Sequence, residues 1–152
     1  MRVSKLLSSR LHIQAKSKDL HYGRTSVYSL QYHLILVTKY RRDVIVGDVK
    51  DALSKLLTSL CEDMSVTIVA MELMPDHVHL LIDAKPTTAI SSVVKGLKGV
   101  SAKLLFRDHP VVKSKLWGGH LWQPSYFACT VSERSQAMIK EYIESQEVRD
   151  GC

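Results

Sequence analysis

The chain has 152 residues, of which 45% are hydrophobic and 24% are charged, a composition typical of one globular domain. No apolar run approaches the ~18 residues that a membrane span needs, so no membrane-spanning helix is expected. The three cysteines lie far apart and form no CxxC pair, which excludes a disulfide framework and a zinc ribbon. A reducing, cytoplasmic compartment fits this cysteine usage best.

The positive charge is concentrated near the N-terminus. The formal net charge is +6, but residues 1–24 hold six Lys or Arg and one Asp, so residues 25–152 account for only +1. We therefore predict a basic N-terminal arm at 1–24, with a transit peptide as the alternative, and one domain at 25–152. Within that domain, 39–42 and 95–115 are locally basic. Such runs can face nucleic-acid phosphates or can be solvated surface.

Hydrophobic periodicity and turn residues predict the secondary structure. In order we expect a strand at 27–38, a helix at 47–64, strands at 65–74 and 77–84, a helix at 87–108, a loop at 109–125, a strand at 126–132 and a helix at 133–150. Met74-Pro75-Asp76 is a hairpin-sized link, and Thr87 or Thr88 can cap the second helix. The apolar stripe of that helix is Ile90, Val93, Val94, Leu97, Val100, Leu104 and Leu105.

The order of these elements predicts the fold. The sequence strand, helix, strand, strand, helix, strand (βαββαβ) is typical of a ferredoxin-like α+β sandwich. In this architecture a four-stranded antiparallel sheet carries two helices on one face, and the helix at 133–150 is additional. The other face of the sheet stays available for a ligand or a partner.

Two histidines stand one residue apart in the strand at 77–84. Because side chains alternate along a strand, His77 and His79 share one face, and Val78 points the opposite way, toward the helices. Positions two apart are ~6.5 Å apart, so the two imidazoles can converge on one cation. Chance alone gives about 0.3 such pairs in a chain with seven histidines. The pair alone therefore also fits two exposed or hydrogen-bonded strand histidines.

The last predicted helix carries two further candidates. Tyr142 and Gln146 are four residues apart, so they lie on one helix face. Tyrosine is a known covalent nucleophile, and the amide oxygen of glutamine is a neutral ligand for a cation. The alternative is an amphipathic helix whose tyrosine packs and whose glutamine is solvated.

Four segments together resemble the HUH single-tyrosine transposases of small insertion sequences, a family that includes the REP-associated tyrosine transposases. They are "YHLILVTKYRRDV" (32–44), "HVHLL" (77–81), "LWGGHLWQPSYF" (116–127) and "EYIESQ" (141–146). HUH stands for histidine, hydrophobic residue, histidine. The resemblance covers about residues 28–147 and keeps the order of the family's motifs.

The resemblance implies an enzyme that cuts and rejoins single-stranded DNA at insertion-sequence ends that carry hairpins. Tyr142 would attack a phosphorus and form a 5′-phosphotyrosine, and His77, His79 and Gln146 would hold a divalent metal. A mixed nitrogen and oxygen set suits Mg²⁺ or Mn²⁺, and Zn²⁺ is the alternative. The resemblance also implies a homodimer with composite active sites and a cytoplasmic, nucleoid-associated location.

Basic and aromatic residues near these motifs are candidate DNA contacts, each with solvated surface or loop packing as the alternative. They are Lys39, Arg41, Arg42, Lys95, Lys98, Lys103, Trp117, His120 and Trp122. Asp76, directly before His77, is a turn residue and a candidate hydrogen-bond partner for that ring.

Two other functions stay open from the sequence. The first is a module that holds single-stranded nucleic acid without cutting it, although the strands lack the aromatic pair that RNA-binding sheets use for stacking. The second is a metal-dependent hydrolase in which Tyr142 only packs. Loss of a covalent DNA adduct in Tyr142→Phe would separate the transposase from both.

Overall fold

The computed structural model describes the backbone of residues 20–132 and 135–150. Contacts divide the chain into two units, Met1–Leu30 and Gln31–Cys152. In the first unit, β1 (His21–Tyr22) and β2 (Val27–Tyr28) form a two-stranded antiparallel hairpin. Most of the predicted N-terminal arm, residues 1–19, lies outside the described residues, so the arm and the domain boundary stay predictions.

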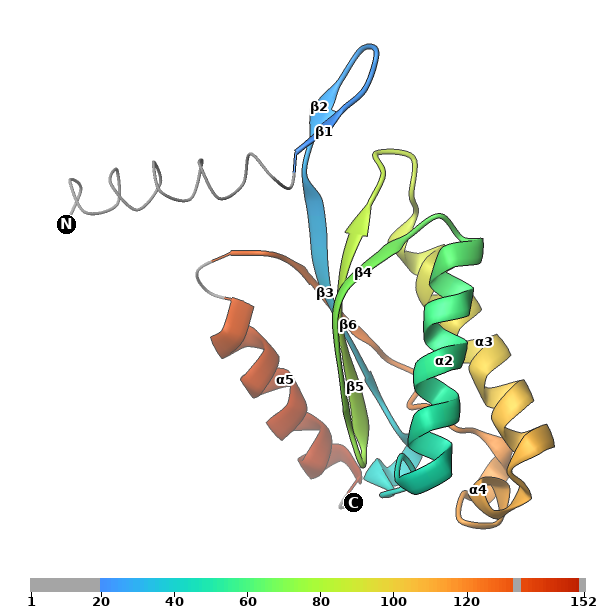
Figure 1. Ribbon diagram of the computed structural model, residues 1–152. Coiled ribbons are helices and arrows are strands. Elements are labelled where there is room, and N and C mark those ends of the chain that lie inside the picture. The colour runs from blue at the N-terminus through green and yellow to red at the C-terminus, as the bar shows by residue number, and fades with distance from the viewer. Residues whose placement is uncertain (1–19, 133–134, 151–152) are drawn as a thin grey trace. The chain divides into compact units, whose positions relative to one another are not determined.

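The second unit contains the predicted βαββαβ arrangement (Figure 1). Its elements are β3 (Leu30–Val37), a 3-10 turn (Lys39–Arg41), α2 (Gly47–Asp63), β4 (Thr67–Met74), β5 (His77–Ala84), α3 (Ile90–Asp108), α4 (Pro110–Ser114), a 3-10 turn (Trp117–Gly119), β6 (Phe127–Thr130) and α5 (Ser135–Asp150). The four strands form one sheet in the order β4-β5-β3-β6. The mixed α+β fold with a four-stranded antiparallel sheet is confirmed.

Helices cover both faces of this sheet (Figure 1). Helices α2 and α3 pack on one face around a core that includes Leu34, Leu36, Leu53, Val78 and Leu97. Helix α5 packs on the other face, where Ile139 meets Ile35 and Val37 of β3 and Phe127 of β6. The face that the sequence left available for a ligand is therefore partly covered by the chain's own C-terminal helix.

Strand β5 follows the predicted pattern residue by residue. Its burial alternates along the strand, with Val78, Leu80 and Ile82 fully buried on the α2–α3 side. The hairpin link is the two-residue turn Pro75-Asp76, and the register pairs Met74 with His77. Because that register is fixed at the turn, every second residue of β5 points to the side of the sheet on which α5 lies, away from the main core.

Three details of the helices differ from the sequence-based prediction. The segment at 109–125 is not only a loop, because Pro110 begins the short helix α4. Helix α3 begins after Ala89, and the Thr88 hydroxyl instead accepts a hydrogen bond from the Lys85 amide at 3.1 Å. In the apolar stripe, Val100 is exposed and Ser101 is buried, because Ser101 lies four residues after Leu97 on the core-facing side.

None of the helices in the described ranges, 20–132 and 135–150, is both long enough and apolar enough to cross a membrane.

Candidate active site on the α5 side of the sheet

The histidine pair occupies the face of β5 that is turned away from α2 and α3. His77 and His79 are half-buried, while Val78 between them is fully buried in the main core. Strand pairing places Glu72 of β4 opposite His79 and Met74 opposite His77. The alternation that was predicted from the sequence therefore holds, and both imidazoles lie on the sheet face that α5 also contacts.

A third histidine, His33 of β3, contacts this pair. Its Nδ1 lies 2.8 Å from Nε2 of His79, and the two ring centroids are 5.0 Å apart. Burial lowers the pKa of both rings, and the neighbouring His33 lowers that of His79 further. Sequence analysis missed His33. Side chains alternate along a strand, so His33 lies on the same face as Ile35 and Val37, the face that α5 contacts. Its proximity to His79 follows only from the order of the strands in the sheet.

Asp76 holds the other histidine of the pair. Its Oδ1 accepts a hydrogen bond from Nδ1 of His77 at 2.8 Å, and its Oδ2 accepts one from Nε of Arg41 at 2.8 Å. Burial would raise the pKa of Asp76, but hydrogen bonds from His77 and Arg41 and the charge of Arg41 bring it below its ordinary value. The carboxylate is therefore ionised at neutral pH and orients the His77 ring through its Nδ1.

Tyr142 packs against Phe127 of β6 and belongs to the cluster around Ile35 and Val37 of β3. Its hydroxyl is 3.3 Å from Oγ of Ser125, and its ring packs on Phe127 with centroids 5.1 Å apart. The histidines stand on β5, and β3 lies between β5 and β6. Neighbouring strands are ~4.8 Å apart, so the backbone of Phe127, which the Tyr142 ring contacts, lies two strand spacings from the strand that carries the histidines.

Gln146, one helical turn after Tyr142, is only 2% exposed. The carbonyl of Ile143, between them, accepts a hydrogen bond from Nη1 of Arg41 at 3.3 Å. Since the same guanidinium binds Asp76, Arg41 joins α5 to the residue that precedes His77. The helix end that carries Gln146 is thus tied to the turn at the start of β5. The alternative of a solvated glutamine does not agree with its burial.

Lys98 of α3 holds the loop that precedes β6. Its ammonium donates to the carbonyl oxygens of Gln123, Pro124 and Ser125 at 2.6, 3.1 and 3.4 Å. Burial lowers the pKa of Lys98. Because its three N–H groups are directed at backbone carbonyls, this lysine acts in the structure as a clamp on the loop that ends at Ser125, the partner of Tyr142.

The predicted DNA contacts fall into different surroundings. Trp122 is 5% exposed and donates its indole N–H to Ser101 at 2.9 Å. In this structure it therefore packs inside the fold, which was the alternative to a DNA contact. Arg41 is held by Asp76. Arg42 and His120 are exposed, Lys39 is half-buried, and the side chain of Trp117 lies outside what the structure describes.

Lys95 and Lys103 are exposed on α3, on the opposite side of the sheet from the histidine pair. DNA lying along α3 would therefore not lie over the histidines of the same chain. The turn that carries Lys39 and Arg42 is closer, because Thr38 donates its backbone N–H to the carbonyl of Asp76 at 2.9 Å. Both sets of contacts stay predictions.

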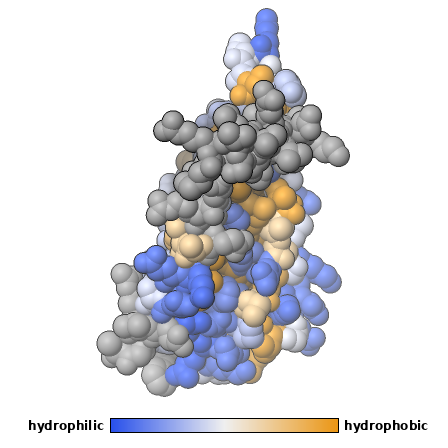
Figure 2. All heavy atoms as spheres, turned by 90° about the vertical axis from the view of Figure 1, so that its left-hand side faces the viewer, coloured by the Kyte–Doolittle hydropathy of each residue, from blue (hydrophilic) through white to orange (hydrophobic). Residues whose placement is uncertain are grey.

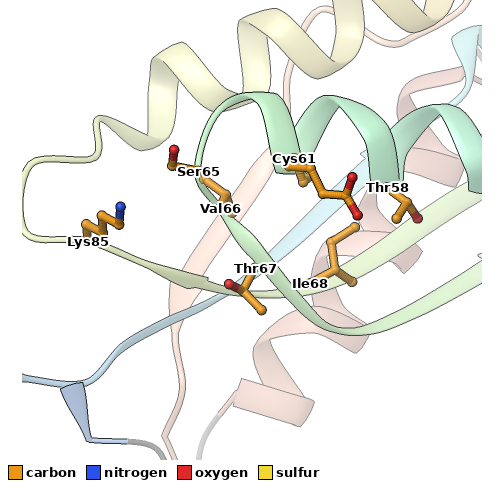
Figure 3. A pocket seen from close by; sticks show the side chains of 8 residues that line it. Thr58, Cys61, Ser65, Val66, Thr67, Ile68 and Lys85 are labelled. Atoms are coloured by element: carbon orange, nitrogen blue, oxygen red, sulfur yellow. The ribbon is translucent and has the colours of Figure 1, made fainter.

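A hollow of about 480 Å³ lies on the histidine face, lined by His33, Ala70, Met71, Glu72, His79 and Leu81. Figure 2 shows this side of the molecule, with hydrophilic side chains gathered where α5 lies and hydrophobic ones above them. A second hollow of about 450 Å³ lies between α2 and β4, near Lys85 (Figure 3). The second hollow contains none of the predicted site residues.

The donor atoms near His77 fit a small divalent cation. Asp76 occupies Nδ1 of His77, which leaves Nε2 of that ring to act as a ligand, the usual arrangement for metal-binding histidines. Among the described residues, no group of three or more His, Cys, Asp or Glu side chains is placed to hold a metal. If the histidine pair holds a cation, the amide oxygen of Gln146 would be a third ligand of another kind, as the sequence predicts.

Comparison with known proteins identifies the family. The family described as "Transposase IS200 like" matches residues 26–146. The ISDra2 transposase TnpA of Deinococcus radiodurans is 50% identical over 128 residues, which cover 84% of this chain and 91% of that protein. The transposase for insertion sequence element IS200 of Salmonella typhimurium is 32% identical over 119 residues, or 78% of each chain.

Solved structures agree with these sequence matches. A crystal structure of a protein from Deinococcus radiodurans R1 has a TM-score of 0.78 and 48% identity, covering 83% of this chain and 97% of that one. A REP-associated tyrosine transposase bound to a REP hairpin has a TM-score of 0.52 at 17% identity, covering 86% and 74%, and shows the shared fold. The fold and the sequence define a transposase. The chain belongs to the IS200-like transposase family, whose members are DNA-cleaving and strand-transferring enzymes.

Proposed function

We propose that this transposase cuts and rejoins single-stranded DNA at insertion-sequence ends through a covalent 5′-phosphotyrosine on Tyr142. One observation carries the proposal: α5 packs on the sheet face that bears His77 and His79. Tyr142 and Gln146 both belong to that helix, and Gln146 is buried. Its binding partner would be single-stranded DNA. The protein would act in the cytoplasm, bound to the nucleoid. A fold relative bound to a REP hairpin supports ends that contain hairpins.

The covalent step conserves the energy of the phosphodiester bond in the link to the tyrosine. The Tyr142 oxygen forms a bond to the DNA phosphorus while the bond from phosphorus to the 3′ oxygen breaks. The phenol loses its proton to solvent, and the departing 3′ oxygen takes one up. A 3′-hydroxyl of a second strand then attacks the adduct and releases Tyr142. Because one ester replaces another at each step, the reaction needs no ATP.

The chain's own residues prepare this site. Ser125 contacts the Tyr142 hydroxyl and can orient it by a hydrogen bond. Asp76 fixes His77, and Arg41 fixes Asp76 and the backbone of α5. His77, His79 and Gln146 would hold Mg²⁺ or Mn²⁺, which when bound polarises the scissile phosphate and offsets charge on its oxygens.

The position of Tyr142 next to Phe127 bears on how the site is assembled. From its contact with β6, the phenol has to approach a phosphate bound near β5, across the inner strand β3. A shift of α5 along the sheet can bring it there within one chain. The helix of a second copy can also supply it, which is the composite site of the proposed homodimer. Helix α5 is held on the sheet by Ile139, Tyr142 and Ile143 and by the Arg41 hydrogen bond to the Ile143 carbonyl.

A denaturing gel tests the proposal directly. The full chain is incubated with Mg²⁺ or Mn²⁺ and labelled single-stranded DNA from the ends of its own element. We expect a protein–DNA adduct in the wild type, none in Tyr142→Phe, and none with a chelator. Tyr126→Phe is the matched control, because Tyr126 is an exposed tyrosine next to the same loop, and it should keep the adduct.

The other two functions appear as distinct outcomes of the same gel. Binding without cleavage of cognate ends indicates the non-catalytic nucleic-acid module. Cleavage that persists in Tyr142→Phe indicates a metal-dependent nuclease and contradicts the tyrosine mechanism. A mixture of Tyr142→Phe and His77→Ala chains tests the composite site, since only mixed dimers with shared sites regain adduct formation.

A further inference from the structure

The contact between His33 and His79 restricts the chemistry of the candidate metal ligand. The two rings come from neighbouring strands, β3 and β5, and their Nδ1 and Nε2 atoms are 2.8 Å apart. His33 is 8% exposed, and an imidazole that binds a metal ion has to be neutral. A neutral imidazole carries one N–H and one lone pair. Only two arrangements of protons therefore give this hydrogen bond.

The two arrangements differ in whether His79 can bind a cation. If His33 donates from Nδ1, then Nε2 of His79 accepts that proton and Nδ1 of His79 carries its own hydrogen. Both nitrogens of His79 are then occupied. If His79 donates from Nε2, His33 accepts through Nδ1, and the lone pair on Nδ1 of His79 is available. A ligand role for His79 with this bond intact requires the second arrangement.

We propose that His33 is a positioning residue that accepts the Nε2–H of His79 and thereby makes Nδ1 of His79 the metal-binding nitrogen. This inference rests on the proposed metal site. It makes the histidine pair asymmetric: His77 is held through Nδ1 by Asp76 and offers Nε2, while His79 is held through Nε2 and offers Nδ1. Each ring then has one partner that fixes its tautomer and one nitrogen for the cation.

The surroundings of the pair agree with this role. His33 stands opposite Cys129 on β6, and His79 stands opposite Glu72 on β4, so the four residues form one row across the sheet. The row borders the hollow that His33, Glu72 and His79 line. Because β3 is an inner strand with Leu34 and Leu36 fully buried, the His33 backbone is held firmly, and a rigid partner is what a positioning role needs.

Two variants separate the hydrogen bond from the bulk of the ring. In His33→Asn, the amide oxygen lies two bonds from Cβ, as Nδ1 of histidine does, and can still accept from His79. In His33→Leu, no acceptor remains. The amount of free Mn²⁺ in solutions of the full chain, measured by electron paramagnetic resonance, gives the affinity. Thermal unfolding of each variant shows that it is folded.

We expect His33→Leu to weaken Mn²⁺ binding ~10–100-fold and His33→Asn to stay within a few-fold of wild type. Equal affinity in wild type and His33→Leu, or tighter binding in His33→Leu, overturns the inference. Wild-type protein that binds Mn²⁺ no better than His77→Ala contradicts the metal site of the proposed function instead. The two failures are therefore distinguishable.

A second measurement needs no metal and no variant. Long-range ¹H–¹⁵N correlation spectra of the metal-free protein report which nitrogen of each histidine carries the proton. We expect His79 to be protonated at Nε2 and His33 to carry an unprotonated Nδ1. A His79 ring protonated at Nδ1 overturns the inference, whatever the result of the Mn²⁺ titration.

Discussion

Arg41 and Asp76 form an ion pair with Nη2 and Oδ2 2.6 Å apart, which links the turn after β3 to the turn before the histidine pair. Their side chains are 20% and 16% exposed. Tyr40 and Arg41 have φ values of 57° and 49°, in the left-handed region that non-glycine residues rarely adopt. This backbone reverses the chain so that Arg41 reaches Asp76 and, with Nη1, the carbonyl of Ile143.

Removing the Arg41 charge should weaken both the fold and the site. In Arg41→Met, the Asp76 carboxylate keeps His77 as a partner but loses its ionic one, in a mostly buried position. We expect the free energy of unfolding to fall by about 1–3 kcal/mol, measured by urea denaturation. Adduct formation should fall as well, because α5 loses its link to the turn before β5.

Arg107→Met is the matched control for this change. Arg107 also pairs with an aspartate, Asp108, at 2.7 Å, but both side chains are more than half exposed. Exposed pairs contribute little to stability, so the urea midpoint should stay at the wild-type value. Equal destabilisation by both variants would show that the Arg41–Asp76 pair has no special role.

The Lys98 clamp should be needed for the position of Tyr142. Lys98→Met removes the donor that three successive carbonyls share, including that of Ser125. We expect a loss of about 1–3 kcal/mol in the free energy of unfolding and a slower adduct-forming step at saturating DNA. Lys95→Met, one turn earlier and exposed, should leave stability unchanged. A rate equal to wild type in Lys98→Met would contradict a role in positioning.

Trp122 and Ser101 should behave as a coupled pair. Ser101→Ala leaves a buried indole N–H without its acceptor, which costs about 1–3 kcal/mol. In Trp122→Phe that N–H is absent, so adding Ser101→Ala to it should cost much less. Urea denaturation of the two single variants and the double variant gives the coupling energy. Additive effects, within about 0.5 kcal/mol, would mean that the hydrogen bond contributes nothing.

Cys61 should make stability fall at high pH. Burial raises the pKa of its thiol to about 11 in the folded chain, whereas an unfolded cysteine titrates near ~8.5. The folded state therefore keeps a proton that the unfolded state loses. The contribution is complete below pH ~8.5 and declines as the pH rises toward 11. Cys61→Ala should show a smaller decline in urea midpoint over this range.

Reagent accessibility gives an independent check on Cys61. The side chain is 0% exposed, whereas Cys129 is half-buried. Native protein treated with N-ethylmaleimide at pH 7.5 should therefore be labelled at Cys129 well before Cys61, as mass spectrometry of peptides can show. Equal labelling of both would place Cys61 in a region that opens readily.

Local sequence signals predicted β5 fully and α3 only in part. The Pro75-Asp76 turn and the strict alternation from His77 onward fix the limits of β5 and its two faces. In α3, hydrophobicity placed Val100 in the core, but the helical angle favours Ser101, and Trp122 supplies a partner for its hydroxyl. That partner is 21 residues away and belongs to a predicted loop, so no local pattern reveals it.

The candidate site, too, could be predicted from the sequence only in part. The face of His77 and His79 followed from periodicity, and the Asp76 contact from its position next to His77. The pairing of His33 with His79 spans 46 residues and depends on β3 lying beside β5. Lys98 was a candidate for DNA because of its charge, and only the folded loop shows that carbonyl oxygens already surround it.

Strand β4 is one edge of the four-stranded sheet, and its pairing with β5 shifts register between Ile68 and Ala70. The extra residue, Val69, is exposed on this edge. A bulge interrupts the regular row of backbone donors and acceptors that another strand would need for pairing. An edge of eight mostly apolar residues is thereby made a poor template for aggregation.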